Sequence, residues 1–167
     1  MRRVFAIFGS ALFLVLAPGI LAGYVPWRIT GWHVGVPLLG TSLSRLVGVL
    51  LIAAGLPVLL DSFTRFALQG VGTPAPIFPT RHLVVSGWYQ YVRNPIYVAV
   101  VSLILGQGLF FASVRVLEYG IAVWVGFYLA VLIYEEPTLR QSYGPEYEDF
   151  CANVPRWIPH LRPWRRN

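Results

Sequence analysis

Four long apolar runs divide this chain and leave few environments open to it. They cover roughly residues 4–27, 41–60, 95–111 and 116–134. A helix needs about 20 apolar residues to cross a bilayer, so the last two runs lie near the lower limit. Of the 167 residues, 56% are hydrophobic and only 12% are charged, which is more apolar surface than a soluble domain of this size buries. The sequence predicts one all-α integral membrane domain, a helical bundle of about four transmembrane helices.

The charges indicate how that bundle is oriented. All 13 basic residues are arginines, they flank the apolar runs, and the net charge is +6, which favours a membrane surface over nucleic acid as the partner. With four spans, one side of the membrane holds ten arginines and the other holds three, Arg28, Arg45 and Arg115. The positive-inside rule then places both termini and the loop between the second and third runs in the cytoplasm.

Two segments near the ends of the chain refine this prediction. The first run follows Arg2-Arg3, as a secretory signal would, but it is longer than the apolar core of a signal, so we expect a membrane span. Within it, Gly19 and Gly23 could allow close approach of another helix, although a simple kink at Pro18-Gly19 is favoured.

The single Cys151 and the scattered histidines have no ligand spacing, so we expect no protein-bound metal.

The connection at 81–97 reads Arg-His-Leu-Val-Val-Ser-Gly-Trp-Tyr-Gln-Tyr-Val-Arg-Asn-Pro-Ile-Tyr. Ser86-Gly87 is a turn signal, and Pro95 suits the first position of a helix. The free N–H groups of that helix start, with Arg93 beside them, predict an anion site at the membrane surface. The alternative is an interfacial loop whose Arg, Trp and Tyr side chains only anchor it to head groups. The residues alone leave both interpretations open.

Polar residues in and after the last two runs allow further predictions. Gln107 is costly in hydrocarbon, and a hydrogen bond to a neighbouring helix is favoured over a role in a cavity. Glu135 and Glu136 are expected at the C-terminal end of the fourth helix, where carboxylates oppose the helix dipole. A ligand ammonium or a nearby Arg would compensate them, but a plain solvated boundary is favoured by the residues alone. The third and fourth runs are separated by only a few residues and are expected to form a C-terminal helical hairpin. After Glu136, a break at Gly144-Pro145 predicts two short interfacial helices and then an extended anchor at 154–159.

The second half of the chain carries five ordered motifs that resemble one family. The motifs are His82-Leu83-Val84 with Ser86-Gly87-Trp88-Tyr89; Arg93-Asn94-Pro95-Ile96-Tyr97; Glu135-Glu136; Tyr143-Gly144-Pro145-Glu146-Tyr147; and Val154-Pro155-Arg156. Together they resemble the isoprenylcysteine carboxyl methyltransferase and phospholipid methyltransferase superfamily. The resemblance covers 81–159, the expected catalytic core, whereas the N-terminal spans in 1–70 carry no such signature.

The resemblance implies an integral-membrane methyltransferase that uses S-adenosylmethionine (SAM) without a Rossmann domain. It implies direct transfer of the methyl group to a lipophilic acceptor that arrives from the bilayer, with the cofactor entering from the cytoplasm. The cofactor-binding positions implied are Arg81, His82, Leu83, Val84, Tyr89, Asn94, Pro95, Ile96, Tyr97, Glu135 and Glu136. The catalytic positions implied are Arg93, Asn94, Tyr97 and Glu135, with Glu135 holding the amino group of the cofactor.

Two departures bear on the acceptor. Prenylcysteine members of the family carry His where this chain has Asn94, which cannot act as a titrating base. They also carry a substrate-binding Arg where this chain has Val131, so a carboxylate acceptor would lose its partner. A phospholipid N-methyltransferase is therefore an alternative. The tail from Tyr147 to Pro159 also resembles NADPH-dependent membrane sterol reductases, and a non-catalytic membrane subunit is a third hypothesis.

Overall fold

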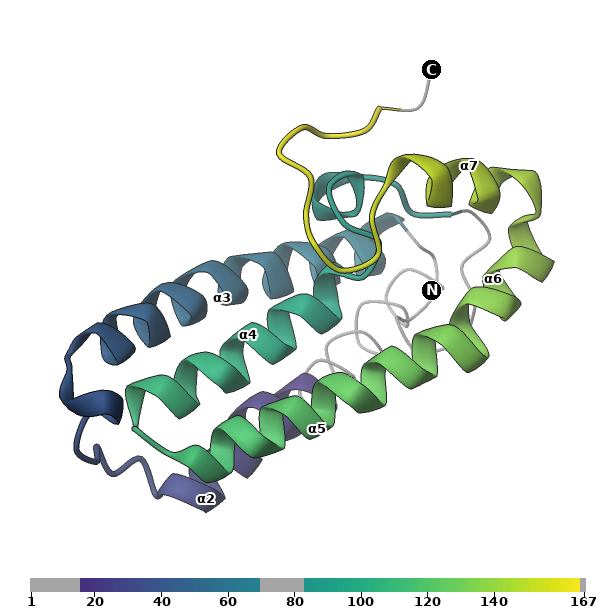
Figure 1. The fold of residues 1–167 in the computed structure, drawn as a ribbon. Coiled ribbons are helices and arrows are strands. Elements are labelled where there is room, and N and C mark those ends of the chain that lie inside the picture. Colours follow the sequence, from purple (N-terminus) through teal and green to yellow (C-terminus); the bar gives the residue numbers. More distant parts are fainter. Residues whose placement is uncertain (1–15, 70–82, 166–167) are drawn as a thin grey trace.

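The computed structural model describes residues 16–69 and 83–165, and every regular element in that part of the chain is helical (Figure 1). The longer elements are α2 (Val25–Thr30), α3 (Leu43–Gln69), α4 (Pro95–Phe110), α5 (Val114–Ala130), α6 (Glu136–Tyr143) and α7 (Pro145–Asn153). Short π turns form η1 (Ile20–Tyr24) and η4 (Val131–Glu135), and short 3-10 turns form η2 (Leu38–Gly40) and η3 (Gly87–Gln90).

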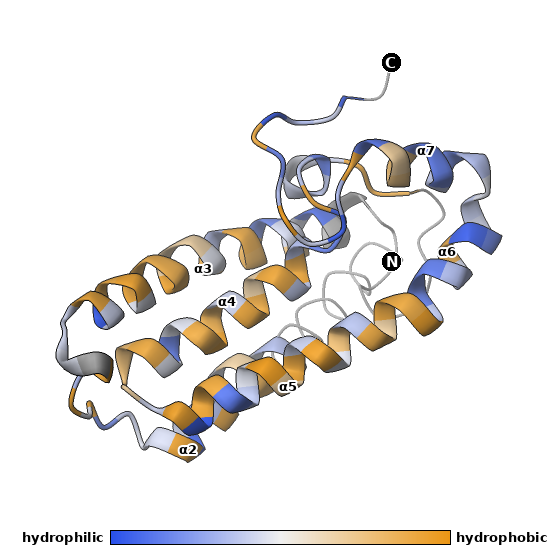
Figure 2. Ribbon diagram, in the orientation of Figure 1, coloured by the Kyte–Doolittle hydropathy of each residue, from blue (hydrophilic) through white to orange (hydrophobic). Residues whose placement is uncertain are grey.

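Two of the described helical segments are long and apolar enough to cross a membrane. They are Leu43–Arg65 in α3, with 23 residues, and Val114–Tyr143, with 30 residues, in which α5, η4 and α6 follow one another without a break. α4 is apolar but shorter, and Figure 2 shows hydrophobic residues along α3, α4 and α5. The chain is thus an all-helical protein with membrane-type helices. A total of four spans stays a prediction, because half of the first predicted run lies outside the described residues.

Glycines bring α3 and α4 into close contact. A Cβ on Gly48 would lie 2.6 Å from the carbonyl oxygen of Gly106, and a Cβ on Gly106 would lie 2.8 Å from that of Gly48. The two helices run in opposite directions and pack side by side (Figure 1). Gly19 and Gly23 had been considered for such an approach, although a kink was favoured, and a Cβ on Gly23 would meet nothing within 4 Å among the described residues.

The N-terminal helix is joined to α4 and α5 at the π turn η1. Gln107 Nε2 donates to the carbonyl oxygen of Ala22 at 2.6 Å, and the Tyr119 hydroxyl donates to that of Leu21 at 3.1 Å. A π turn widens the helix and is an established cause of helix irregularity, and this one begins at Ile20, directly after Pro18-Gly19. The kink favoured there stays a prediction. The prediction that Gln107 bonds to a neighbouring helix is confirmed.

The fourth predicted run does not end at Tyr134, because the helix continues to Tyr143. The chain then turns at Gly144, whose φ of 51° favours glycine, and α7 begins at Pro145. The break at Gly144-Pro145 is confirmed, with the difference that the first of the two short helices is the end of the long one. Tyr147 and Phe150 of α7 form a small buried cluster with Val154.

Candidate functional site

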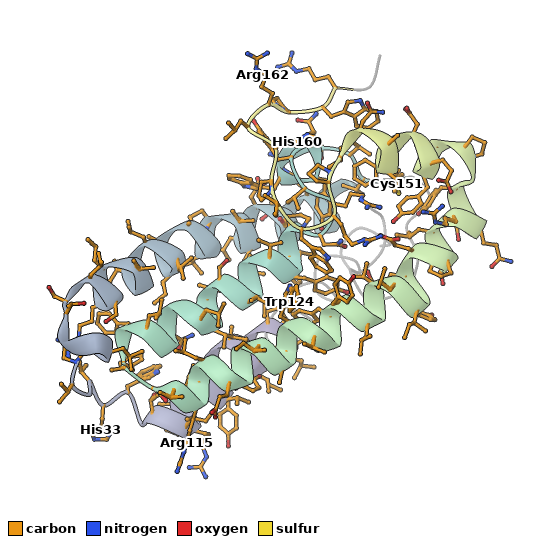
Figure 3. All side chains as sticks on the ribbon, viewed as in Figure 1. His33, Arg115, Trp124, Cys151, His160 and Arg162 are labelled. Atoms are coloured by element: carbon orange, nitrogen blue, oxygen red, sulfur yellow. The ribbon has the colours of Figure 1, made fainter. Side chains whose placement is uncertain are left out.

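The predicted site residues that the structure describes meet at one end of the bundle. The first turn of α4, the π turn η4 and the segment after α7 come together there, while the α2–α3 connection lies at the opposite end (Figure 1). In Figure 3, Cys151 and His160 mark the site end, and His33 and Arg115 mark the other. Pro95 is the first residue of α4, as predicted from its fixed φ.

Tyr97 and Glu135 form the centre of this cluster. The Tyr97 hydroxyl donates a hydrogen bond to Glu135 Oε1. The Tyr97 ring stacks on Phe127 of α5, with ring centroids 4.4 Å apart and an angle of 24° between the planes. Glu135 forms no ion pair with any residue that the structure describes. Its charge is therefore met by a neutral hydroxyl, from a side chain that stacking holds in place.

Glu136, the next residue, has a different environment. Arg156 binds it with two hydrogen bonds, Nε to Oε1 at 2.6 Å and Nη2 to Oε2 at 3.0 Å, and Arg93 Nη1 lies 3.2 Å from Oε1. Only 7% of the Glu136 side chain is exposed. The hydrogen bond to Glu136 raises the pKa of Arg156. Two guanidinium groups thus compensate one buried carboxylate, which would otherwise be costly to bury.

These contacts correct the predictions made for Glu135, Glu136 and Arg93. Glu135 and Glu136 lie inside a continuous helix and not at its end, so the argument from an opposing helix dipole is wrong. The solvated boundary favoured for this pair is also wrong for Glu136, which is buried and has the nearby Arg that was considered as the alternative. Arg93 does not stand free beside the start of α4, because its Nη1 donates to Glu136 and to Cys151 Sγ.

The π turn η4 explains how two adjacent carboxylates reach different partners. It immediately precedes Glu136, and Pro137 follows in the first turn of α6. Proline lacks an N–H and clashes with the carbonyl four residues before it in a regular helix, and a widened turn relieves this conflict. Such turns occur often at functional sites. No pattern in the sequence predicted this π turn.

A C-terminal segment, residues 154–165, lies across the connection that precedes α4. The backbone N–H of Arg93 donates to the carbonyl oxygen of Pro155 at 2.9 Å, and Asn94 Nδ2 donates to that of Arg156 at 3.1 Å. Further along, His160 and Trp164 donate backbone hydrogen bonds to Tyr91 and Gln90, both at 2.9 Å. Residues 154–159 were predicted to form an extended interfacial anchor, which stays a prediction; the structure shows that the segment binds the connection that carries Arg93 and Asn94.

Tyr89 joins the cluster from η3. It is buried, and burial, followed by the nearby ionisable groups of Tyr97, Glu135 and Asp61, raises its pKa. Asp61 had been identified only as the end of the second run, and it pairs with Arg65 at 2.8 Å. The Arg65 side chain packs directly on Gly87, where a Cβ would overlap it. α3 therefore supports the site through η3, a contribution without a local sequence signal.

The remaining predicted residues are distributed as follows. Ile96 packs against the core of the bundle, and Leu83 packs against the Tyr147–Phe150–Val154 cluster. Val84 is half-buried in the segment that leads into η3. Arg81 and His82 lie outside the described residues. Among the described side chains, no group of three or more His, Cys, Asp or Glu could hold a metal ion.

Comparisons with known proteins point to one family and two kinds of relative. A family model described as phospholipid methyltransferase matches residues 43–146. A Delta(14)-sterol reductase from Mus musculus is 31% identical to this chain over 91 residues, which are 52% of this chain and 21% of the reductase. Protein-S-isoprenylcysteine O-methyltransferase B from Arabidopsis thaliana is 28% identical over 80 residues, which are 47% of this chain and 40% of that protein. The chain thus matches less than half the length of each of these curated relatives. No solved structure matches.

Proposed function

The chain belongs to the phospholipid methyltransferase family, and from this premise we propose that it is an integral-membrane, SAM-dependent methyltransferase acting on a lipophilic acceptor. Its catalytic core is the segment 81–159, and residues 1–70 supply N-terminal spans. The site end and both termini face the cytoplasm.

The observation that carries this proposal is the contrast between the two adjacent carboxylates. Glu136 already has two arginines, whereas the described residues offer Glu135 only the Tyr97 hydroxyl. A carboxylate in such a place gains most from a cationic ligand. SAM brings an ammonium and a sulfonium, and its carboxylate needs a donor. Arg93 Nε is buried without a hydrogen-bond partner in the described structure, so it can supply one.

In this proposal the residues of the chain bind and orient the cofactor, and they exclude water from the site. Glu135 and Tyr97 hold the amino group, and Tyr89 with Asn94, Pro95 and Ile96 lines the cofactor. SAM supplies an already activated methyl group, so positioning contributes much of the rate enhancement. Asn94 donates its amide to the carbonyl oxygen of Arg156 and cannot take a proton from the acceptor, so no base is assigned to it. The segment 154–165 covers the site from the aqueous side and limits the access of water.

The acceptor we propose is a lipid with an amine or hydroxyl group. Val131, at the position where prenylcysteine members carry Arg, is buried and apolar. Arg93 Nη1 is bound to Glu136, and in this proposal its remaining buried Nε–H serves the SAM carboxylate, while Arg140 pairs with Glu148 at 2.5 Å. A carboxylate acceptor would therefore be desolvated without a cation of its own.

The test is transfer from tritiated SAM in membranes that contain the protein, with an aminophospholipid set beside a prenylcysteine analogue. We expect saturable labelling of the aminophospholipid and at most weak labelling of the prenylcysteine carboxyl. Efficient methylation of the prenylcysteine carboxyl would show that another residue replaces the missing Arg.

A second candidate is a sterol reductase that uses NADPH, and the 31% identity to the Delta(14)-sterol reductase favours it. Against it, NADPH is strongly anionic, and two arginines of the site are already bound to Glu136. Oxidation of NADPH that depends on an added sterol would establish this activity. A non-catalytic membrane subunit would bind neither cofactor.

A further inference from the structure

Arg156 connects the two halves of the site. Its backbone carbonyl accepts the hydrogen bond from Asn94, the residue just before α4, at 3.1 Å. Its guanidinium holds both oxygens of Glu136, the residue just after Glu135. Tyr97 lies three residues beyond Asn94, so the same residue fixes the start of the helix that carries Tyr97 and the turn that carries Glu135.

The surroundings of Arg156 hold it firmly. The preceding residue, Pro155, accepts the backbone hydrogen bond of Arg93, and the following residue, Trp157, stacks on Tyr128 of α5 with ring centroids 6.0 Å apart. The guanidinium and the two carboxylate oxygens form a paired, two-bond contact that a lysine ammonium cannot reproduce. The geometry of the contact, in addition to its charge, is therefore specific to arginine.

We propose that Arg156 is a positioning residue, which sets the placement of Glu135 opposite Tyr97 by clamping Glu136 and the start of α4. It acts on the cofactor only through these neighbours. The expected effect on SAM binding rests on the proposed function. The clamp, by which we mean the contacts of Arg156 with Glu136 and Asn94, is a property of the protein without ligand.

Clamping and simple charge compensation have opposite consequences. If Arg156 only neutralised Glu136, its removal would make the site more negative and would leave SAM binding unchanged or tighter. A lysine would then restore the original affinity in full. If Arg156 positions Glu135, both Arg156→Gln and Arg156→Lys weaken SAM binding, because neither keeps the two-bond contact.

The experiment compares these two variants with Arg140→Gln and Arg140→Lys in purified protein reconstituted in nanodiscs. Arg140 is a matched control, because it also pairs with a glutamate but both side chains of that pair are about half exposed, 48% and 53%. SAM affinity is measured by calorimetry. We expect losses of about three- to thirtyfold for both Arg156 variants, and no change for the Arg140 variants. Unchanged or tighter binding by Arg156→Gln, or full affinity in Arg156→Lys, would overturn the inference.

A second measurement needs no ligand. Backbone hydrogen exchange is followed in the segments 90–97 and 131–136 of the same variants. We expect faster exchange in both segments for Arg156→Lys and wild-type rates for Arg140→Lys, whereas wild-type exchange in Arg156→Lys would show that there is no clamp. If the wild-type protein fails to bind SAM, the proposed function is wrong, and the exchange rates still decide whether Arg156 positions the turn.

Discussion

Glu135 and Glu136 differ by one position in the sequence and by the kind of group that meets them. Glu136 is held by two arginines in a buried network, and Glu135 meets a tyrosine hydroxyl. A buried carboxylate with two guanidinium partners contributes to stability, because its loss leaves two cations without a compensating charge. A carboxylate without a cation is available to a ligand. The two residues should therefore respond differently to the same substitution.

We predict that Glu135→Gln weakens SAM binding more than Glu136→Gln does. Loss of one charge-assisted hydrogen bond should cost about 1.5–3 kcal/mol, or roughly ten- to a hundredfold in affinity. Glu136→Gln should instead lower the free energy of unfolding, by about 3–5 kcal/mol at most, because it leaves the partly buried Arg93 and Arg156 without their carboxylate partner. Calorimetry and thermal unfolding on both variants separate the two effects. Equal SAM affinity in the wild type and Glu135→Gln would refute the assignment of Glu135.

The sequence indicated these residues but not their partners. The motif match marked Tyr97 and Glu135, and the excess of negative charge suggested that a cation was needed. However, Glu136 is 43 residues from Arg93 and 20 residues from Arg156, and Glu135 is 38 residues from Tyr97. Pairing over such separations depends on how the helices pack, which one sequence does not reveal. Of the two compensating groups considered, the structure shows the arginine for Glu136, and the ligand ammonium remains a prediction for Glu135.

At the scale of elements, the contact between α3 and α4 depends on glycine. We predict that Gly106→Ala lowers the free energy of unfolding by about 1–3 kcal/mol, because its Cβ would lie 2.8 Å from a carbonyl oxygen of α3. Gly126→Ala in α5 is the control: a Cβ there meets nothing within 4 Å, so we expect no loss, or a gain of about 0.5–1 kcal/mol from helix propensity. Denaturation of both variants in the same detergent makes the comparison. Equal stability of the two would show that the helices do not pack as described.

Helix existence was predictable from the apolar runs, and one helix boundary was not. Pro95 marked the start of α4 correctly, because the fixed φ of proline suits the first position of a helix. Glu135 and Glu136 were expected at the C-terminal end of the fourth helix, before Pro137. The helix instead continues through the π turn to Tyr143. Arg93 and Arg156 compensate Glu136, and the widened turn η4 accommodates Pro137, so the helix can continue past them. These contacts depend on tertiary structure.

For the whole molecule, the arginine bias predicts on which side each end of the bundle lies. Val36 is 84% exposed in the α2–α3 connection, and Leu161 is 99% exposed in the segment after α7. These two segments lie at opposite ends of the bundle (Figure 1). We predict that single cysteines at these two positions react with an impermeant thiol reagent from opposite sides of a sealed vesicle, with Leu161 on the cytoplasmic side. The parent protein with Cys151 alone gives the background. Labelling of both positions from the same side would contradict this topology.

The most direct test of the central claim is thermal unfolding of the purified wild-type protein with SAM, its demethylated product or NADPH. A ligand that binds only the native state stabilises it by about 2.7 kcal/mol at a hundred times its dissociation constant, so binding appears as a higher melting temperature. We predict that SAM raises the melting temperature, that NADPH does not, and that Glu135→Gln abolishes most of the SAM effect. A rise with NADPH and none with SAM would contradict the account.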